Sequence, residues 1–582
     1  MSDLTLLRYY SRLAPLGVGD DIKTALPMVA ETLFTSARHA RNLLNDMQNL
    51  GWLTWTPKVG RNQRSTLLLN HPLMELKKQL AAIRVQQGKY EKALEILDND
   101  QVAFGQLLQT TSGASMREGR LHIQLTYKRP FERLVPHDLQ RSSERYLLRQ
   151  IYCCLVHSNG DGVLEPQLAH HWHYDESTLE WTFYLRPGLS FHNGDVIDAK
   201  GIADLFNKLK QLPHYQSELS HLSEVTAPLS NKVVFKLSIA DQGFGGLISG
   251  VKYGIQPANQ LTESDSKRVV GSGPFSIYEH SNHKLCLEAF ERYYGCRALT
   301  DQVTIWQIDE TELREKQIET NQPEAQQDSC NYYLSHAVDA HSRNDTQQSR
   351  IEDGCLFVLF NQQPASALSD AQRRYLSSFI KAEKIIEQLI QSNQLFGCEL
   401  AYNLLPIWHK IIRPAAPKVA LPTHITIAVY DYTALQNCAL ALKALLEQQG
   451  TQVTINVYSF RDLNQRAMAG TLDESLILTN INLDDNRHAS AFSSLYHNPV
   501  LQSCIGPEAK LWLTQSLNQL RSETPLSQYL SALEPIASAL INQYWLTPLF
   551  HHRQTLRFHG VLKDVALTNW GWPDIKNVWS AD

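Results

Sequence analysis

The stretch LEPQLAHHWHYDESTLEWTFYLRPGLSFHNGDVIDAKGIADLF, residues Leu164–Phe206, decides the fold of the larger part of this chain. Its first half predicts two strands joined by a hairpin at Asp175–Ser177, because apolar and polar residues alternate on both sides of a short polar turn. Arg186–Gly188 predicts an edge turn, and Asp198 is well placed to cap a following helix. Strands and helices that alternate in this way indicate an α/β fold.

The same alternation extends over most of the chain. From Gly119 onward the hydrophobic period becomes that of strands, as in Leu121–Leu125. Farther on, GSGPFSIYEH (Gly271–His280) predicts a tight turn that leads into a strand, and FERYYG follows at Phe290–Gly295. A chain of 582 residues is too long for one compact unit, so we expect a multidomain protein in which residues 118–582 form α/β lobes.

Residues 1–72 have a different pattern, that of three short helices followed by a hairpin. Apolar spacing predicts helices over 4–13, 24–33 and 36–50, then strands over 52–55 and 65–69. Ser36 is a good N-cap for the third helix, and Gly51 is suited to end it. That helix is expected to bury Ala40, Leu43, Leu44, Met47 and Leu50. The set predicts a winged helix-turn-helix, mainly α with a β-hairpin wing.

Basic residues gather on the third predicted helix and in the hairpin turn. From Ser36 to Arg64 there are five Lys or Arg and one acidic residue. Arg reads guanine and Asn reads adenine in the major groove, and a basic turn can contact phosphates or the minor groove. The alternative to DNA binding is a solvated basic face on a small protein-interaction domain, because winged helices also bind proteins. The candidate DNA-binding residues are Ser36, Arg38, His39, Arg41, Asn42, Lys58, Arg61, Asn62, Gln63 and Arg64.

Residues 73–117 continue with helical periodicity and form a predicted helical linker. Such helices could brace the winged helix, mediate dimerisation or act as a spacer. The pattern does not decide among these roles.

Three motifs in the large region carry a family resemblance. L-E-P-x-L-A-x-x-W and W-x-F-x-L-R-P-G-x-x-F-H-x-G lie in the opening stretch, and G-S-G-P-F-x-I begins at Gly271. They resemble the oligopeptide, dipeptide and nickel class of solute-binding proteins. The resemblance is weaker over residues 350–582, where it rests on Leu359–Asn361, Leu404–Pro406 and Asn569–Gly571. Joined to a winged helix in this order, the whole chain resembles the SgrR family of transcription regulators.

The resemblance implies a two-lobed α/β domain of the periplasmic-binding-protein type II fold, with ligand held between lobes that hinge closed. It also implies a transcriptional response to accumulated sugar phosphate, including activation of a small-RNA gene and repression of the regulator's own gene. The implied partners are double-stranded promoter DNA and a small-molecule effector, with RNA polymerase as a further candidate. The alternative hypothesis is a solute or peptide receptor of an ABC-type importer, which would require export.

The bulk composition favours a cytoplasmic protein without a membrane partner. The net charge of −5 means that any nucleic-acid site must be a local patch. Mean hydropathy is −0.30, and no apolar run approaches the roughly 18 residues of a membrane span. Arg8 and Arg12 interrupt the apolar positions near the start, so no signal-peptide core can be drawn. Nine cysteines without a C-x-x-C pair favour reduced thiols.

The ligand site can be nominated only by its chemistry. An anionic sugar phosphate would be recognised by Arg or Lys, by helix N-termini and by an aromatic ring that stacks on the sugar. The arginines could instead form surface or inter-lobe salt bridges, and the tryptophans could pack in the core. The candidate ligand-binding residues are Tyr127, Arg129, Arg141, Ser142, Arg145, Asn361, Trp408 and Trp570.

No motif predicts catalysis, a cofactor or a metal site. The glycine-rich segments 243–246 and 271–273 lack the Lys-Ser/Thr of a phosphate-binding loop, and no G-x-S-x-G or H-E-x-x-H motif occurs. His170–His173 and His551–His552 are the densest histidines, but no acidic or Cys partner stands at ligand spacing. We therefore expect structural or surface histidines, no enzyme activity, no cofactor and no metal.

Overall fold

A computed structural model describes residues 3–58, 64–86, 89–100, 103–105, 107, 114–127, 129–263, 268–307, 332–334, 345–363, 368–559 and 562–580. The chain divides into two compact units. The first comprises residues 1–130, 305–324 and 333–345, and the second comprises 131–304, 325–332 and 346–582. In the described part of the chain, no helix combines the length and the apolar character needed to span a membrane.

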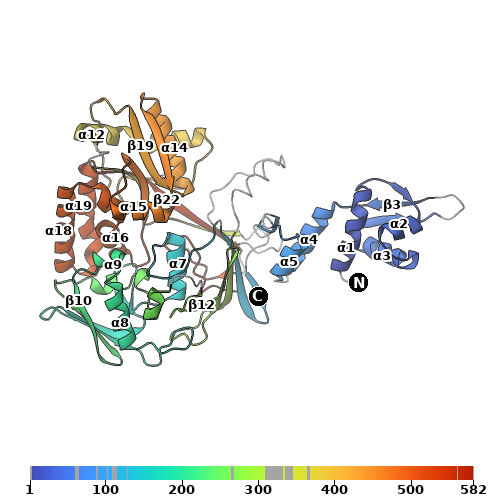
Figure 1. Ribbon diagram of the computed structural model, residues 1–582, viewed down its shortest axis with the longest axis horizontal. Helices are drawn as coiled ribbons and strands as arrows, with labels where there is room; N and C mark the ends of the chain where they lie inside the picture. The colour runs from blue at the N-terminus through green and yellow to red at the C-terminus, as the bar shows by residue number, and fades with distance from the viewer. Residues whose placement is uncertain are drawn as a thin grey trace. The chain divides into compact units, whose positions relative to one another are not determined.

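The start of the first unit has the winged helix-turn-helix arrangement that the sequence predicts (Figure 1). Its elements are α1 (Asp3–Leu13), β1 (Ile22–Thr24), α2 (Leu26–Thr32), α3 (Ala37–Asn49), β2 (Leu53–Thr56) and β3 (Ser65–Leu69). Ser36 caps α3, since its side chain accepts from the His39 backbone N–H at 3.3 Å. Gly51 ends α3 with φ +75°, a conformation that favours glycine.

Two details of this region differ from the sequence-based expectation. Residues 22–24 form strand β1, which pairs antiparallel with β3 and completes the sheet order β1-β3-β2, so the second helix begins only at Leu26. Leu50 is 51% exposed, whereas the expected helical pattern buried it. Its position after the last turn of α3 takes it off the apolar stripe of that helix.

Linker helices α4 (Leu73–Gln86) and α5 (Tyr90–Ile96) share one core with the winged helix. A tryptophan from a distant part of the chain joins this core. Trp306, at the end of β14 (Thr300–Gln307), is 4% exposed and packs edge-on against Phe104 with ring centroids 5.0 Å apart. Its indole N–H donates to the Gln124 side chain in β5 (Arg120–Tyr127) at 2.7 Å. The core of the first unit is therefore completed by a residue some 200 positions later in sequence than its neighbour in α5.

The second unit begins with an antiparallel α/β region. Its main sheet has the order β10-β11-β9-β8, formed by β8 (Ala169–Asp175), β9 (Glu180–Leu185), β10 (Leu222–Leu229) and β11 (Lys232–Leu237). The predicted hairpin is present, and Asp175 Oδ1 accepts from the Ser177 backbone N–H at 2.9 Å. The predicted helix is α8 (Ala199–Leu209), capped by Asp198, which accepts from Gly201 N–H at 2.8 Å. The strand predicted after Gly273 is β12 (Phe275–His280), which pairs with β13 (Lys284–Ala289).

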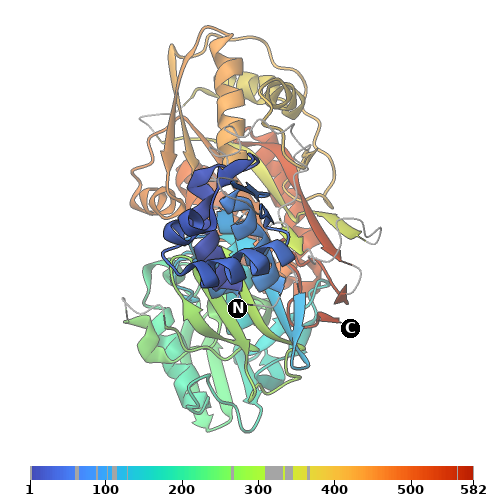
Figure 2. The same cartoon turned by 90° about the vertical axis from the view of Figure 1, so that its right-hand side faces the viewer.

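A second region of the same unit contains parallel strands. Its sheet includes β17 (Gly354–Phe360), β19 (His424–Tyr430), β20 (Gln452–Tyr458), β21 (Leu476–Asn482) and β22 (Leu546–His559), in the order β22-β17-β21-β19-β20. Strand β19 runs parallel to both β20 and β21. Helix α14 (Thr433–Glu447) lies along these strands in both views (Figure 1, Figure 2).

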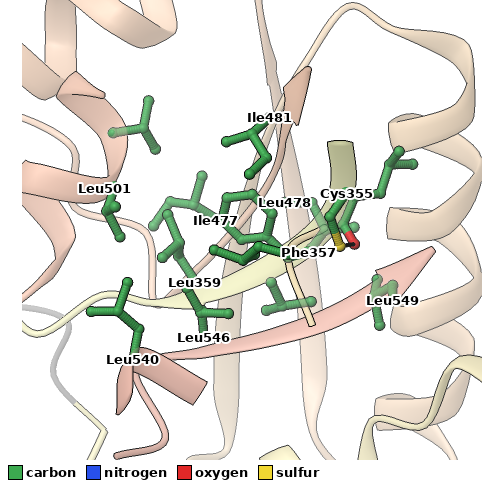
Figure 3. Close-up of a cluster of buried hydrophobic side chains, with 14 of the residues drawn as sticks. Cys355, Phe357, Leu359, Ile477, Leu478, Ile481, Leu501, Leu540, Leu546 and Leu549 are labelled. Carbon is green, nitrogen blue, oxygen red and sulfur yellow. Dashed lines mark hydrogen bonds between the residues drawn. The ribbon is translucent and has the colours of Figure 1, made fainter. Parts of the chain in front are cut away.

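The core of this second region lies where β17, β21 and β22 meet (Figure 3). Leu359, Leu478 and Leu546 come from these three strands and are each 0% exposed. Helix α19 (Tyr529–Asn542) adds Leu540 to the same cluster. Strand β17 is buried at every position, which fits the continuous apolar run GCLFVLF and a central place in the sheet. The loops that follow β19 and β21 continue from strands of this buried core.

Candidate functional site

The exposed face of α3 is the first candidate site. Arg38, Arg41 and Asn42 are exposed, whereas Ala40, Leu43, Leu44 and Met47 on the opposite face are 0% exposed. Positions three and four apart lie on the same side of a helix, so the burial of one stripe aims the polar residues outward together. A helix that presents Arg and Asn in this way has the side chains needed to contact base edges in a major groove.

His39 and Ser36 have structural tasks at the start of this helix. Ser36 is the cap described above, and His39 is half-buried. The His39 ring packs edge-on against Tyr9 of α1, with ring centroids 6.0 Å apart. This contact fixes the direction in which the first turn of α3 points.

The wing supplies further exposed cations. Lys58 and Arg64, which flank the hairpin turn, are exposed, and the Lys58 backbone N–H donates to Ser65 Oγ at 3.3 Å. Lys23 on β1 is also exposed and donates to Thr66 Oγ1 at 2.7 Å. The sequence reading missed Lys23 because strand β1 was not expected. The predicted turn residues Arg61, Asn62 and Gln63 lie outside the described residues.

Helix α3 and the wing share an apolar core and are also linked by a side-chain hydrogen bond. Gln48 Oε1, in the last turn of α3, accepts from the backbone N–H of Trp55 in β2 at 2.8 Å. Because this bond links the helix to the wing directly, the exposed faces of both keep one relative orientation.

A second candidate site lies on helix α7 (Ser142–Ile151) in the second unit. Three arginines follow one another at intervals of four: Arg141 directly before the helix, then Arg145 and Arg149. Arg145 Nε lies 2.6 Å from Asp484 Oδ1, and one Arg149 Nη lies 2.7 Å from Asp485 Oδ1. Arg141 forms an ion pair with Asp431. The sequence reading named Arg141 and Arg145 but missed Arg149, which the i, i+4, i+8 spacing could have revealed.

The three acidic partners share a place in the fold. Asp431 follows the last residue of β19, and Asp484 and Asp485 come shortly after β21. The carboxyl ends of β19 and β21 meet at one edge because these strands are parallel neighbours. Residues at this edge are where open α/β sheets commonly bind ligands.

Asp484 brings two predicted ligand residues together. Its Oδ1 accepts from Arg145 Nε at 2.6 Å and from the Trp570 indole N–H at 2.9 Å. Trp570 is 5% exposed, and the neighbouring Asn569 side chain donates to the Asp484 carbonyl at 3.2 Å. The C-terminal segment therefore helps to fix the Asp484 loop against α7.

Neighbouring carboxylates favour the charged form of Arg149. Burial disfavours the charged form of Arg149, but the attraction of Asp485 and of further groups outweighs it and raises the pKa of the guanidinium. The side chain of Arg149 is 10% exposed, that of Arg145 24% and that of Arg141 22%. These are partly buried ion pairs rather than solvated ones.

The other predicted ligand residues either belong to the first unit or form hydrogen bonds with backbone groups away from α7. Tyr127 and Arg129 belong to the first unit, with the guanidinium 5.3 Å from the tyrosine ring centroid. Asn361 is 1% exposed and donates to the carbonyls of Leu472 and Glu474.

Trp408 and Ser142 complete the set. Trp408 is 6% exposed and its indole N–H donates to the Leu530 carbonyl at 2.8 Å. Ser142 is the first residue of α7 and is half-buried. Of the eight nominated residues, Arg141, Ser142, Arg145 and Trp570 gather at α7 and its acidic partners.

Comparison with known proteins agrees with this two-part organisation. A family model described as "Sugar transport-related sRNA regulator N-term" matches residues 5–119, and one described as "Bacterial extracellular solute-binding proteins, family 5 Middle" matches residues 163–392. The chain is 30% identical over 583 positions to the HTH-type transcriptional regulator SgrR of Yersinia pestis strain Pestoides F, with 100% of this chain and 99% of that protein covered. The SgrR protein of Photorhabdus laumondii is also 30% identical, with the same coverage.

Solved structures give the fold of the larger part. The oligopeptide-binding protein AppA of Bacillus subtilis, in complex with a nonapeptide, matches with a TM-score of 0.62 and 15% identity, covering 81% of this chain and 100% of AppA. The periplasmic binding protein DppA of Helicobacter pylori matches with a TM-score of 0.63 and 17% identity, covering 80% of this chain and 99% of DppA. The predicted fold class, a winged helix joined to a solute-binding-protein domain, is confirmed.

Proposed function

This chain belongs to the SgrR family of HTH-type transcriptional regulators, and we propose on that premise how its parts divide the work. Residues 1–72 bind promoter DNA, residues 73–117 form a helical linker, and residues 118–582 sense a small molecule. The family is one of transcriptional regulators rather than enzymes.

The observation that carries the DNA proposal is the exposed face of α3. Arg38, Arg41 and Asn42 point away from a fully buried apolar stripe. We assign them to base edges in the major groove, with Ser36 and His39 setting the direction of the helix. Lys58, Arg64 and the turn residues between them are assigned to phosphates, which position the domain without reading sequence.

We further propose that the effector is a sugar phosphate. The regulator then acts in the cytoplasm on a small-RNA gene and on its own gene, with RNA polymerase as a partner at the promoter. The support is the family description, which names sugar transport and a small RNA. An importer receptor would share the solute-binding fold, but it would not account for a match to regulators over the full length.

Fluorescence anisotropy of the full chain on a labelled DNA fragment from upstream of its own gene tests the proposal. Physiological salt and unrelated competitor DNA keep the assay specific. Specific binding that changes when glucose 6-phosphate is added, but not when glucose is added, supports both assignments. Binding to unrelated DNA with equal affinity contradicts the promoter assignment, and specific binding that ignores glucose 6-phosphate contradicts the effector assignment.

A further inference from the structure

We propose that the face of α7 that carries Arg141, Arg145 and Arg149 is a binding site for the phosphate group of the effector, and that the phosphate competes there with Asp431, Asp484 and Asp485. This inference rests on the proposed function, because it names the place where the charge of the effector is recognised. It also proposes a mechanism. The same guanidinium groups bind either the aspartates that follow β19 and β21 or the phosphate of the ligand.

The helix geometry brings the three cations together. Residues four apart on an α-helix lie about 6 Å apart along the axis and nearly on one line. Arg145 and Arg149 therefore lie on one face of α7, and Arg141, the residue directly before the helix, continues this row of arginines by one turn. Arg–phosphate pairs are frequently bidentate, so a row of this kind suits a phosphate monoester.

Arg149, the most buried of the three arginines, has a hydrogen-bond donor that is not used. One Nη of Arg149 contacts Asp485 at 2.7 Å and the Ser249 carbonyl at 2.9 Å, but its buried Nε has no hydrogen-bond partner within the described structure. A buried donor without an acceptor is costly, and an anion would relieve this cost. His157 Nδ1 lies 3.9 Å from Asp485 Oδ2 and is likewise buried without a hydrogen bond among the described groups.

The place of this row in the fold also favours a ligand. The acidic partners lie at the carboxyl ends of β19 and β21, from which the chain continues in different directions. After β19 it enters α14 and returns as β20, whereas after β21 it enters α16 (Arg487–Tyr496). Neighbouring parallel strands whose connections diverge leave room between them, and ligands of α/β sheets bind at such points.

Competition follows from the charges. Three arginines face three aspartates, and a phosphate that pairs with the arginines releases carboxylates that the row now holds. The loops after β19 and β21 are then no longer tied to α7. A ligand with this differential effect shifts the balance between two arrangements of the second unit, as an effector must.

Isothermal titration calorimetry of the full chain tests the site with three probes: glucose 6-phosphate, inorganic phosphate and glucose. We expect saturable binding of glucose 6-phosphate and none of glucose. The double variant Arg145→Gln with Arg149→Gln should weaken glucose 6-phosphate binding by about tenfold or more, because each loses a charge-assisted hydrogen bond. Arg461→Gln is the matched control. It breaks another ion pair of the same unit, with Glu132 at 2.8 Å, and should leave binding unchanged.

A second variant gives an effect of opposite sign and does not depend on the stability of the arginine variants. Asp431→Asn removes one competing carboxylate, which is 47% exposed, so the phosphate should bind more tightly. Tighter binding in Asp431→Asn together with weaker binding in the arginine variant supports competition. Unchanged affinity in both, or no saturable binding of either phosphate probe by the wild-type chain, overturns the inference.

The outcomes separate this inference from the proposed function. If promoter binding responds to glucose 6-phosphate equally in wild type and in the arginine double variant, the effector assignment stands and the α7 site is wrong. If specific promoter binding is absent while the calorimetric results hold, the α7 site stands and the DNA assignment fails. Saturable binding of inorganic phosphate with the affinity of glucose 6-phosphate would identify free phosphate as the ligand.

Discussion

Helices α3 and α7 use the same residue type in opposite ways. Arg38 and Arg41 of α3 are exposed and have no ion-pair partner in the part of the chain that the structure describes. Arg145 and Arg149 of α7 are partly buried and each faces an aspartate. The first helix therefore presents local positive charge to the solvent, although the whole chain carries −5. The cations of the second helix are neutralised by aspartates of the same unit, so an external anion would have to displace those aspartates to bind.

Removing the cations of α3 is the most direct test of the difference between the two helices. Arg38→Ala with Arg41→Ala should reduce affinity for the promoter fragment by about 10²–10⁴-fold, since a base-reading Arg contributes about 1–3 kcal/mol. Anisotropy titration measures this loss. Lys78→Ala, which removes an exposed charge from α4, is the control and should change affinity little. Similar losses in both variants would mean that α3 acts only through general charge.

The partly buried Arg149–Asp485 ion pair should contribute more to stability than an exposed ion pair does. Arg149→Ala leaves Asp485 without its cation and should lower the free energy of unfolding by about 3 kcal/mol. Arg461→Ala breaks a pair whose side chains are 46% and 61% exposed and should cost at most about 1 kcal/mol. Urea unfolding of the two variants provides the measurement. Equal shifts would show that the α7 pairs behave as solvated surface contacts.

His192 tests a related point, because it is a half-buried base that has no ion-pair partner among the residues the structure describes. Burial lowers the pKa of His192 to about 4. The Gly271 N–H donates to its Nδ1 at 3.3 Å, and its Nε2 faces the Gly273 carbonyl at 3.0 Å, which together suit the neutral ring. The unfolded residue titrates near 6.5, so its stabilising contribution is complete above that pH and declines as the pH falls toward 4.

We therefore expect His192 to account for about 2 kcal/mol of the stability lost between pH 7 and pH 5. Urea unfolding at both pH values measures the loss. The variant His192→Gln lacks the titration and should lose correspondingly less. If wild type and variant declined in parallel, His192 would not be neutral in the folded chain.

The smallest expected effect concerns the wing. Lys58→Ala and Arg64→Ala should each reduce the slope of log affinity against log salt by about 0.9, since each phosphate contact releases about that many counterions. The base preference should remain, because phosphate contacts carry no sequence information. Binding at several salt concentrations gives the slope, and an unchanged slope in both variants would remove the wing from the interface.

Local signals were sufficient for much of the first unit. The Ser36 cap, the Gly51 terminator and the β2–β3 hairpin depend on residues a few positions apart, so the sequence reveals them. Strand β1 escaped because it is three residues long and its partner β3 lies about 43 positions later. For the same reason, the sequence did not indicate that Lys23 is an exposed cation beside the wing.

The α7 site shows the limit more strongly. The partners of Arg141 and Arg145 lie 290 and 339 positions away, and no spacing rule connects them. Sequence chemistry could nominate arginines but not the aspartates that hold them. Asn361 was nominated from a family motif and Trp408 as an aromatic ring that could line the pocket. In the structure both donate to backbone carbonyls of the same region.

Trp306 has a consequence for dissecting the protein. The first unit is assembled from separate pieces of the chain, and the indole that fills the space beside Tyr90 and Phe104 arrives from residues beyond 304. A fragment that stops near residue 130 would lose that indole and leave the Gln124 amide oxygen without its donor. Such a truncation should expose an apolar hollow and self-associate, so a single cut near residue 130 does not give an intact first unit.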